Sequence, residues 1–172
     1  MLDSLENGRR FRLLNIVDDY TRECLAIEVD TSLNGERVTR VLGRLAEFRG
    51  LPKVIVVDNG PEFAGRTLDA WASINGLKLH FIRPGKPVEN AYIESFNGRV
   101  RDECLNMNAF GSLFEARHRL ELWRLDYNRH RPHGALGGKT PEQFAQTLLE
   151  GQAAKRSSPR EQADMTRKIP AS

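Results

Sequence analysis

The pattern of apolar and polar positions predicts two antiparallel strands near the start of the chain. Residues 11–17 are rich in apolar side chains, residues 23–29 alternate between apolar and polar positions, and the polar turn 18–22 lies between them. Asn7-Gly8 is typical of a hairpin turn, yet only six residues precede Asn7. We therefore expect the strand before this turn, the first strand of the sheet, to be truncated or missing.

Apolar residues spaced three and four positions apart predict helices in much of the remaining chain. The predicted helices cover residues 34–49, 65–74, 89–101 and 112–127, and a short last helix begins at Thr140. The apolar runs 53–57 and 77–82 predict two further strands. The first of these runs is continuous, which is typical of a strand buried on both faces of a sheet.

The order of these elements predicts the fold class. Two strands are followed by alternating helices and strands and then by two helices, which indicates an α/β protein with a mixed sheet flanked by helices. This is the arrangement of a ribonuclease H-like fold. Residues 1–149 are enough for one domain. Residues 150–172 are polar, lack periodicity and carry most of the net positive charge, so they predict a disordered basic tail.

Composition narrows the classes of function only slightly. The 172 residues include 26 Lys and Arg against 23 Asp and Glu, a mildly basic balance that is compatible with nucleic acid but not diagnostic of it. Cys24 and Cys104 form no CxxC motif, so we expect reduced thiols in a cytoplasmic protein. No apolar run is long enough for a membrane span, and the first residues do not resemble a signal peptide.

Two acidic residues at the ends of predicted elements are the candidate catalytic residues. Asp58 follows the strand 53–57, and Glu94 lies early in the helix 89–101, with 35 residues between them. Carboxylates held on rigid elements suit Mg²⁺ or Mn²⁺, because hard cations prefer oxygen ligands. Two such ions can clamp the attacking and leaving oxygens of a phosphodiester. The pair therefore favours a metal-dependent reaction on nucleic acid.

The helix around Glu94 predicts where its carboxylate lies. With about 100° between successive residues, one polar stripe forms beside one apolar stripe. The polar stripe holds Asn90, Glu94, Asn97 and Arg101, and the apolar stripe holds Ile93, Phe96, Val100 and Cys104. Glu94 is thus expected at the edge of the buried face. Each acid also has an ordinary interpretation, Glu94 as a first-turn acid that the helix dipole favours and Asp58 as a turn residue.

Three motifs together resemble the integrase core of insertion-sequence transposases, and most closely the insertion sequence three family. The motifs are Val57-Asp58-Asn59-Gly60-Pro61-Glu62-Phe63, Glu94-Ser95-Phe96-Asn97-Gly98 and Tyr127-Asn128-Arg129-His130-Arg131-Pro132-His133. The resemblance covers residues 3–149, with Leu136-Gly137 and Thr140-Pro141 matching the family's last motif. It implies that Asp58 and Glu94 are the second and third members of an Asp-Asp-Glu triad for two Mg²⁺ or Mn²⁺ ions.

The resemblance also implies the partners of the protein. These are the DNA of the element ends, target DNA and further copies of the chain. The expected location is the cytoplasm of a bacterium, in association with the nucleoid. Lys86, Arg99 and Arg101 are the candidate contacts to DNA phosphates, although each is equally compatible with a solvated surface charge. For Arg129, Arg131 and His133 we favour a role in packing the helix against the loop over a role in binding DNA.

The sequence departs from the family at its start. The first catalytic Asp of the family would fall just before Met1, by alignment with the segment 3–8. Asp18 and Asp19 are the alternatives for a third acid, although their position favours a role in forming the turn. Two rival functions follow, a catalytically inactive remnant that at most binds DNA and a ribonuclease H-like nuclease. The motif at 127–133 argues against the nuclease.

Overall fold

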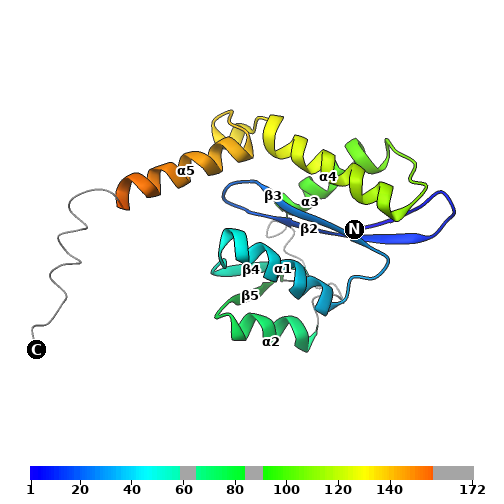
Figure 1. Cartoon of the computed structure of the whole chain (residues 1–172), viewed down its shortest axis with the longest axis horizontal. Coiled ribbons are helices and arrows are strands. Elements are labelled where there is room, and N and C mark those ends of the chain that lie inside the picture. The colour runs from blue at the N-terminus through cyan, green and yellow to red at the C-terminus, as the bar shows by residue number, and fades with distance from the viewer. Residues whose placement is uncertain (59–64, 84–90, 157–172) are drawn as a thin grey trace, which may run out of the picture.

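A computed structural model describes residues 1–58, 65–83 and 91–156 of the chain. The chain begins with a three-stranded antiparallel sheet in the order β1 (Leu2–Ser4), β2 (Arg10–Val17) and β3 (Cys24–Asp30) (Figure 1). Gly8 adopts a φ of 79° in the turn between β1 and β2, a left-handed conformation that favours glycine. The strand before this turn is therefore present, but only three residues long.

A second sheet contains two parallel strands, β4 (Val54–Val57) and β5 (Lys78–Phe81), in the register Val54↔Lys78. No ladder joins it to the antiparallel sheet within the described ranges. The α/β class is confirmed, while the single mixed sheet that we expected is present as two sheets.

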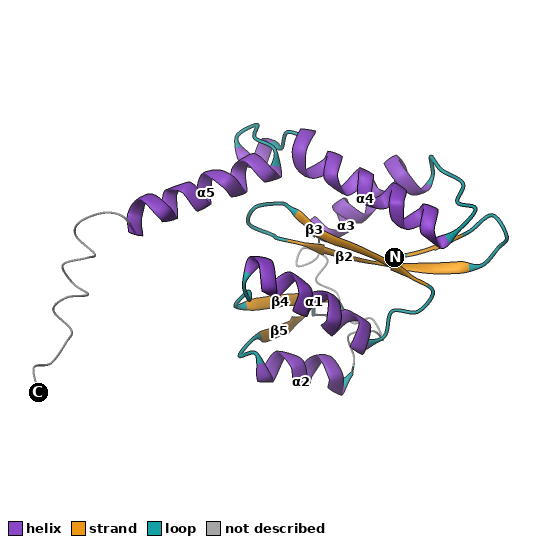
Figure 2. Cartoon of the chain, in the orientation of Figure 1, coloured by secondary structure: helices purple, strands orange, loops and turns teal. Residues whose placement is uncertain are grey.

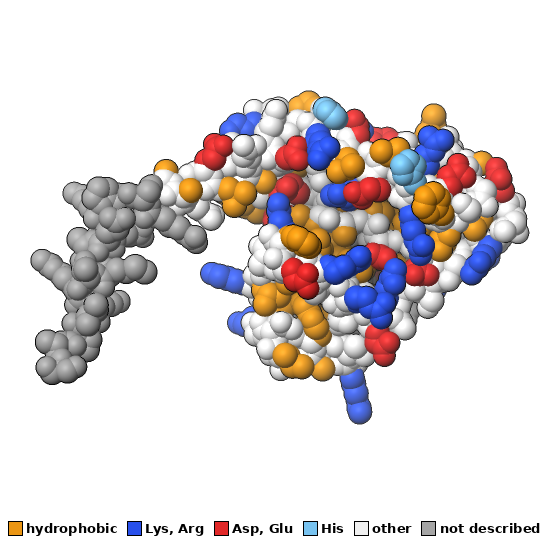
Figure 3. Space-filling view, in the orientation of Figure 1, with side chains coloured by type: hydrophobic (Ala, Val, Ile, Leu, Met, Phe, Trp, Pro, Cys, Tyr) orange, Lys and Arg blue, Asp and Glu red, His pale blue; other side chains and the backbone are white. Residues whose placement is uncertain are grey.

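The expectation that β4 is buried on both faces is wrong. Val54 and Val56 are 47% and 54% exposed, whereas Val57 is 5% exposed. Among the described residues, the backbone of β4 pairs with β5 alone, and a cavity borders the strand between the two sheets. Figure 3 shows hydrophobic side chains on the surface of this part of the molecule.

Helices cover the two sheets separately (Figure 2). On the parallel side lie α1 (Gly35–Arg49) and α2 (Arg66–Ile74). On the other face of the antiparallel sheet lie α3 (Ala91–Val100), which continues as a π-helical turn over Arg101–Leu105, and α4 (Leu113–His130). A short 3-10 turn, Gly134–Leu136, leads into α5 (Pro141–Arg156), which projects away from both sheets (Figure 1).

The helix starts follow from capping residues in the sequence. The side chains of Asn34 and Ser112 accept hydrogen bonds from the first turns of α1 and α4. Thr140 and Gln143 form a reciprocal capping box at the start of α5. The predicted disorder from residue 150 is wrong for residues 150–156, which continue α5. The rest of the predicted tail lies outside the described residues.

Two hydrophobic clusters share strand β2. Phe11 and Leu13 of β2 pack with α3 and α4, while Leu14 packs with α1 and α2. This division follows from the alternation of side chains along a strand. Cys24 and Cys104 are buried free thiols in the first cluster, and burial raises the pKa of Cys104 to about 11. No helix in the described part of the chain combines the length and apolar character of a membrane span.

Candidate active site

Asp58 lies at the mouth of a groove between β2 and β4. The β-branched run Val54–Val57 forms strand β4, and Asp58 follows its last residue as an exposed side chain. The groove has a volume of about 630 Å³ and is lined by residues of both strands, including Asn15, Val17, Val56 and Asp58. The first predicted catalytic residue therefore faces a cavity that a ligand can enter.

Glu94 lies in the first turn of α3, beside the same groove. Ile93 and Asn97 line the groove, and Glu94 is exposed on the adjoining side of the helix. The predicted apolar stripe is confirmed, because Phe96, Val100 and Cys104 are buried in the first core cluster and Ile93 packs against it. Asp58 thus lines the groove itself, and Glu94 lies on α3 next to a residue that lines it.

The donor groups of the two acids fit a hard divalent cation. Asp58 and Glu94 offer carboxylate oxygens at the end of a strand and in a helix, the ligand type that Mg²⁺ and Mn²⁺ prefer. Within the described residues, no three His, Cys, Asp or Glu side chains come together as a metal site. Asp18, Asp19 and Asp58 all line the groove, but among the described residues they do not gather into a three-residue metal site.

Asn15 and Asn97 connect the floor of the groove to α3. Asn15 Nδ2 donates a hydrogen bond to Asn97 Oδ1 at 2.7 Å. Asn15 Oδ1 is buried and has no hydrogen-bond partner among the described residues. A buried polar atom without a partner is costly, so this oxygen marks a place in the groove where a donor group is favoured.

Asp18 and Asp19 form the turn between β2 and β3. Asp18 Oδ1 accepts hydrogen bonds from the backbone N–H groups of Tyr20 and Thr21, at 2.8 and 3.0 Å. Asp19 pairs with Arg22. Both acids line the groove, yet one carboxylate oxygen of each is engaged in a local contact, as the turn-forming interpretation predicts.

The structure separates the two described members of the three predicted phosphate contacts. Arg101 donates a hydrogen bond to the backbone oxygen of Leu2 at 2.8 Å, so one part of its guanidinium ties the π-helical turn to β1. Arg99 lies on the other flank of α3 and lines a smaller cavity. Lys86 lies outside the described residues. Arg99 and Arg101 therefore do not form one basic patch.

The motif at residues 127–133 has the packing role that we favoured for most of its members. Arg131 forms an ion pair with Glu103 at 2.5 Å, and this contact is the main cause that lowers the pKa of Glu103. Arg129 pairs with Glu142 of α5 at 3.4 Å. Asn128 Oδ1 accepts from Cys24 N, and its Nδ2 donates to Cys24 O, both at 2.9 Å.

Sequence reasoning did not identify the residues of the smaller cavity as a group. Arg22, Tyr92 and His133 meet there from three distant segments of the chain. One local signal for Arg22 was its position at the end of a turn rich in polar residues. Nothing in the spacing of the sequence connects it with Tyr92, because that contact depends on the packing of α3 against the β2–β3 turn.

Two family models, both described as Integrase core domain, match the chain over residues 2–87 and 75–141. A 31.7 kDa protein of insertion element IS407 from Burkholderia multivorans is 52% identical over 145 residues, which are 84% of this chain and 52% of that protein. A 39.2 kDa protein of insertion element IS476 from Xanthomonas euvesicatoria is 47% identical, over 89% of this chain and 44% of that protein. The chain belongs to the integrase core family, and it spans about half the length of these relatives.

The fold is that of retroviral integrase cores. The catalytic core domain of HTLV-2 integrase, solved in complex with magnesium in a trimeric form, superposes with a TM-score of 0.66. The two chains are 16% identical, over 84% of this chain and 90% of that one. The predicted ribonuclease H-like fold is confirmed.

Proposed function

We propose that this chain is the catalytic core of a transposase that moves an insertion sequence. In this proposal the intact enzyme cuts the 3′ ends of the element and joins them to target DNA. The observation that carries the proposal is that Asp58 lines the groove while Glu94 lies on α3 directly after Ile93, which lines the same groove. The family membership and the names of the insertion-element relatives support the same function.

Asp58 and Glu94 are the proposed ligands of Mg²⁺ or Mn²⁺. Such ions, when bound, neutralise charge that develops on the oxygens of a reacting phosphodiester. The part of the protein is to hold two carboxylates at fixed positions, one by the β4–β5 pairing and one by the packing of α3. Repulsion between the two carboxylates favours a cation between them. The magnesium complex of HTLV-2 integrase supports this choice of metal.

We propose that the third acid lies on a strand that precedes Met1 in the intact protein and occupies the groove. The hydrogen bonds between β1 and β2 support this proposal. Leu13 and Met1 exchange two backbone hydrogen bonds, of 2.8 and 2.9 Å. Because alternate residues of an antiparallel strand face the same neighbour, Asn15 and Val17 turn their backbone groups toward the continuation of β1, inside the groove.

The edge of β4 supports the same strand from the other side of the groove. Lys53 O and Val57 O accept hydrogen bonds from the segment that contains β5, so the backbone groups of Val54 and Val56 turn the opposite way. These are the two exposed valines of β4. A strand between β2 and β4 would cover them, join the two sheets and bring its side chains next to Asp58.

DNA and further copies of the chain are the proposed partners. In the proposed reaction both the element ends and the target are DNA. We therefore expect the protein to act at the nucleoid, in the cytoplasm of a bacterium. Assembly into an oligomer is supported by the trimeric form of the HTLV-2 integrase core. Arg101, Arg99 and Lys86 remain the proposed phosphate contacts.

The experiment compares strand transfer by this chain and by a form extended upstream through the strand proposed for the groove. Both are incubated with Mn²⁺ and a labelled DNA that carries the element ends. We expect transfer by the extended form and none by the present chain, because a cooperating set of catalytic residues loses orders of magnitude in rate with one member. Transfer by the present chain would show that its own acids, Asp18 or Asp19 first, complete the site.

Variants of the extended form test the two assigned acids. Glu94→Gln and Asp58→Asn are each expected to abolish transfer. Asp102→Asn is the matched control, because Asp102 is an exposed acid on the helical segment that follows Glu94. If the extended form itself transfers no strands while remaining folded, the chain is an inactive remnant.

A further inference from the structure

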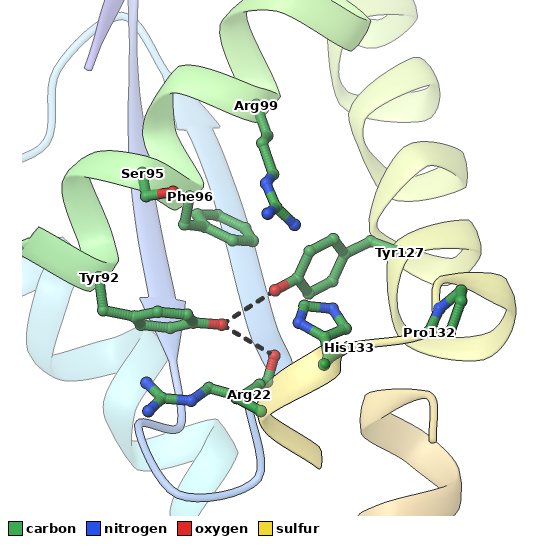
Figure 4. A pocket seen from close by; sticks show the side chains of 10 residues that line it. Arg22, Tyr92, Ser95, Phe96, Arg99, Tyr127, Pro132 and His133 are labelled. Atoms are coloured by element: carbon green, nitrogen blue, oxygen red, sulfur yellow. Dashed lines mark hydrogen bonds between the residues drawn. The ribbon is translucent and has the colours of Figure 1, made fainter. Parts of the chain in front are cut away.

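A second cavity lies along α3, next to the groove, and Tyr92 lines both. Its volume is about 290 Å³. Figure 4 shows that its side chains come from α3, from the end of α4 and the loop after it, and from the β2–β3 turn. The lining polar side chains are Arg22, Tyr92, Ser95, Arg99, Tyr127 and His133.

The charge of this cavity is positive. Arg22 and Arg99 line it, and no Asp or Glu is among its described lining residues. Arg99 has no carboxylate within ion-pair distance in the described part of the chain. Arg22 lies 4.1 Å from the centre of the Tyr92 ring, a cation–π contact, and also pairs with the exposed Asp19. The cavity therefore favours an anion.

His133 provides a polar atom that lacks a partner. Its Nε2 is buried and makes no hydrogen bond to any described residue, while its ring packs edge-on against Tyr127 at 5.2 Å. Burial, followed by the nearby Arg99, Arg131 and Arg22, lowers the pKa of His133. The imidazole is therefore neutral at neutral pH, and a neutral ring can still donate one N–H to a ligand.

The backbone holds Arg22 in an unusual conformation. Its φ is 63°, the only positive value in the described chain outside glycine. This conformation is costly for a residue with a side chain, and it is maintained by the hydrogen bond from Arg22 N to Asp18 O at 2.8 Å. The Tyr92 hydroxyl is 3.4 Å from Arg22 O and 2.9 Å from the Tyr127 hydroxyl. These contacts fix the backbone of Arg22, and its guanidinium lies against the Tyr92 ring.

The surface of α3 connects this cavity with the candidate active site. At about 100° per residue, Glu94 and Arg99 lie on opposite sides of the exposed face of α3. Gly98 lies between them, and a Cβ added there would meet nothing within 4 Å. No side chain therefore rises from the exposed face of α3 at Gly98, which has Glu94 on one side and the cationic cavity on the other.

We propose that this cavity binds a backbone phosphate of a DNA strand that crosses α3. Arg22 and Arg99 supply the charge, and the Ser95 hydroxyl and the His133 ring N–H donate hydrogen bonds. The proposal rests on the proposed function for the identity of the anion, because it assumes a DNA substrate. It adds a phosphate site that is separate from the metal-binding acids and holds the strand on the Arg99 side of the catalytic helix.

The test measures the binding of a short fluorescently labelled DNA by the present chain in EDTA. Arg99→Gln and Arg22→Gln are each expected to weaken binding about tenfold. Each is also expected to reduce the slope of log affinity against log salt by about one. Arg40→Gln is the matched control, because Arg40 is an exposed arginine on α1 without a described ion pair. It is expected to change the affinity less than twofold.

The second readout is the imidazole of His133, followed by NMR and assigned with His133→Gln. A bound phosphate places negative charge beside the ring, so DNA is expected to raise the pKa of His133 above its value in the free protein. Unchanged affinity in both arginine variants, with thermal unfolding curves like those of the unmodified chain, would overturn the proposal. A shift of His133 with inorganic phosphate but not with DNA would also overturn it, by identifying a site for the free anion.

The outcome is independent of the catalytic test. The binding assay contains no metal, so it does not depend on the acids proposed to hold one. If the extended form transfers no strands while Arg99→Gln and Arg22→Gln weaken DNA binding, the phosphate site stands and the proposed function falls. If the extended form transfers strands and the arginine variants bind DNA normally, the proposed function stands and the phosphate site falls.

Discussion

The two halves of the molecule differ in how well they are packed. The antiparallel half, made of β1–β3 with α3 and α4, buries a cluster of thirteen residues. The parallel half, made of β4, β5, α1 and α2, packs against Leu14 and Leu33, and these two residues are counted in its buried cluster of six. Phe96 contacts both Trp123 and Tyr127 in the first half. Large apolar side chains are exposed in both halves, such as Phe48 in the second and Phe114 in the first, so the difference lies in the size of the buried clusters.

This difference matters because the candidate site draws one acid from each half. Glu94 belongs to the antiparallel half and Asp58 to the parallel half. Ion pairs at the edge of the groove join the halves, with Arg37 of α1 bound to Glu28 of β3 at 2.5 Å and Arg49 paired with Glu23. The spacing of the two acids thus depends on the less well-packed half, which a strand in the groove would complete.

The largest expected effect comes from cavities cut into each core. Leu120 and Leu68 are both fully buried, one in each half. Leu120→Ala is expected to lower the free energy of unfolding by about 3–5 kcal/mol, and Leu68→Ala by about 2–3 kcal/mol. The second value is lower because Leu68 already borders the groove. Urea unfolding measures both, and an equal or greater loss at Leu68 would break the comparison.

A polar contact gives the next effect. Asn128 satisfies both backbone groups of Cys24 and so ties α4 to β3. Asn128→Ala leaves a buried N–H without its partner and is expected to cost about 1–3 kcal/mol. The counterpart in the parallel half is Asn34→Ala, which removes the cap of α1 and is expected to cost about 1 kcal/mol. Thermal unfolding of the two variants ranks them.

The groove face of β4 predicts a contrast between neighbouring valines. Val57→Thr places a hydroxyl in the core and is expected to cost about 1–3 kcal/mol. Val56→Thr is expected to change stability by less than about 0.5 kcal/mol, because Val56 is 54% exposed. In the form extended upstream, Val56→Thr is expected to become destabilising, since the added strand covers it. A neutral Val56→Thr in the extended form would contradict occupation of the groove.

The smallest expected effect is a pH dependence in the antiparallel half. The hydrogen bond from Arg131, with a lesser contribution from Trp123, holds the pKa of Glu103 below the usual range of a glutamate. The folded state therefore binds this proton less tightly than the unfolded state. The stabilisation is full above about pH 4.5 and declines as pH falls toward the lowered pKa. Glu103→Gln is expected to flatten stability in that acidic range, as measured by thermal unfolding at a series of pH values.

Much of the fold could be predicted because local signals agreed with tertiary packing. The stripe of Phe96, Val100 and Cys104 is buried as its spacing predicts, and Asn34, Ser112 and Thr140 cap the helices that they were expected to begin. The two acids lie at the ends of elements that periodicity located. The local sequence pattern was sufficient to predict a helix or a strand wherever its apolar face is buried in a core.

The remaining features depend on which elements meet. The apolar run of β4 carries no sign that Val54 and Val56 face a groove, because their exposure depends on the strand beside them. The cavity of Arg22 and His133 requires the β2–β3 turn and the loop after α4 to meet at α3. The extension of α5 to Arg156 was not predicted, because the sequence after Gly151 has no apolar stripe.

The most direct test of the account is whether Asp58 and Glu94 share one metal ion. Mn²⁺ broadens the NMR signals of nearby amides, and we expect it to broaden Val57, Asp58 and the first turn of α3 together. Both regions should recover in Glu94→Gln and in Asp58→Asn, but not in Asp102→Asn. Broadening at only one of the two acids, or unchanged broadening in either variant, would contradict a site built from both halves of the molecule.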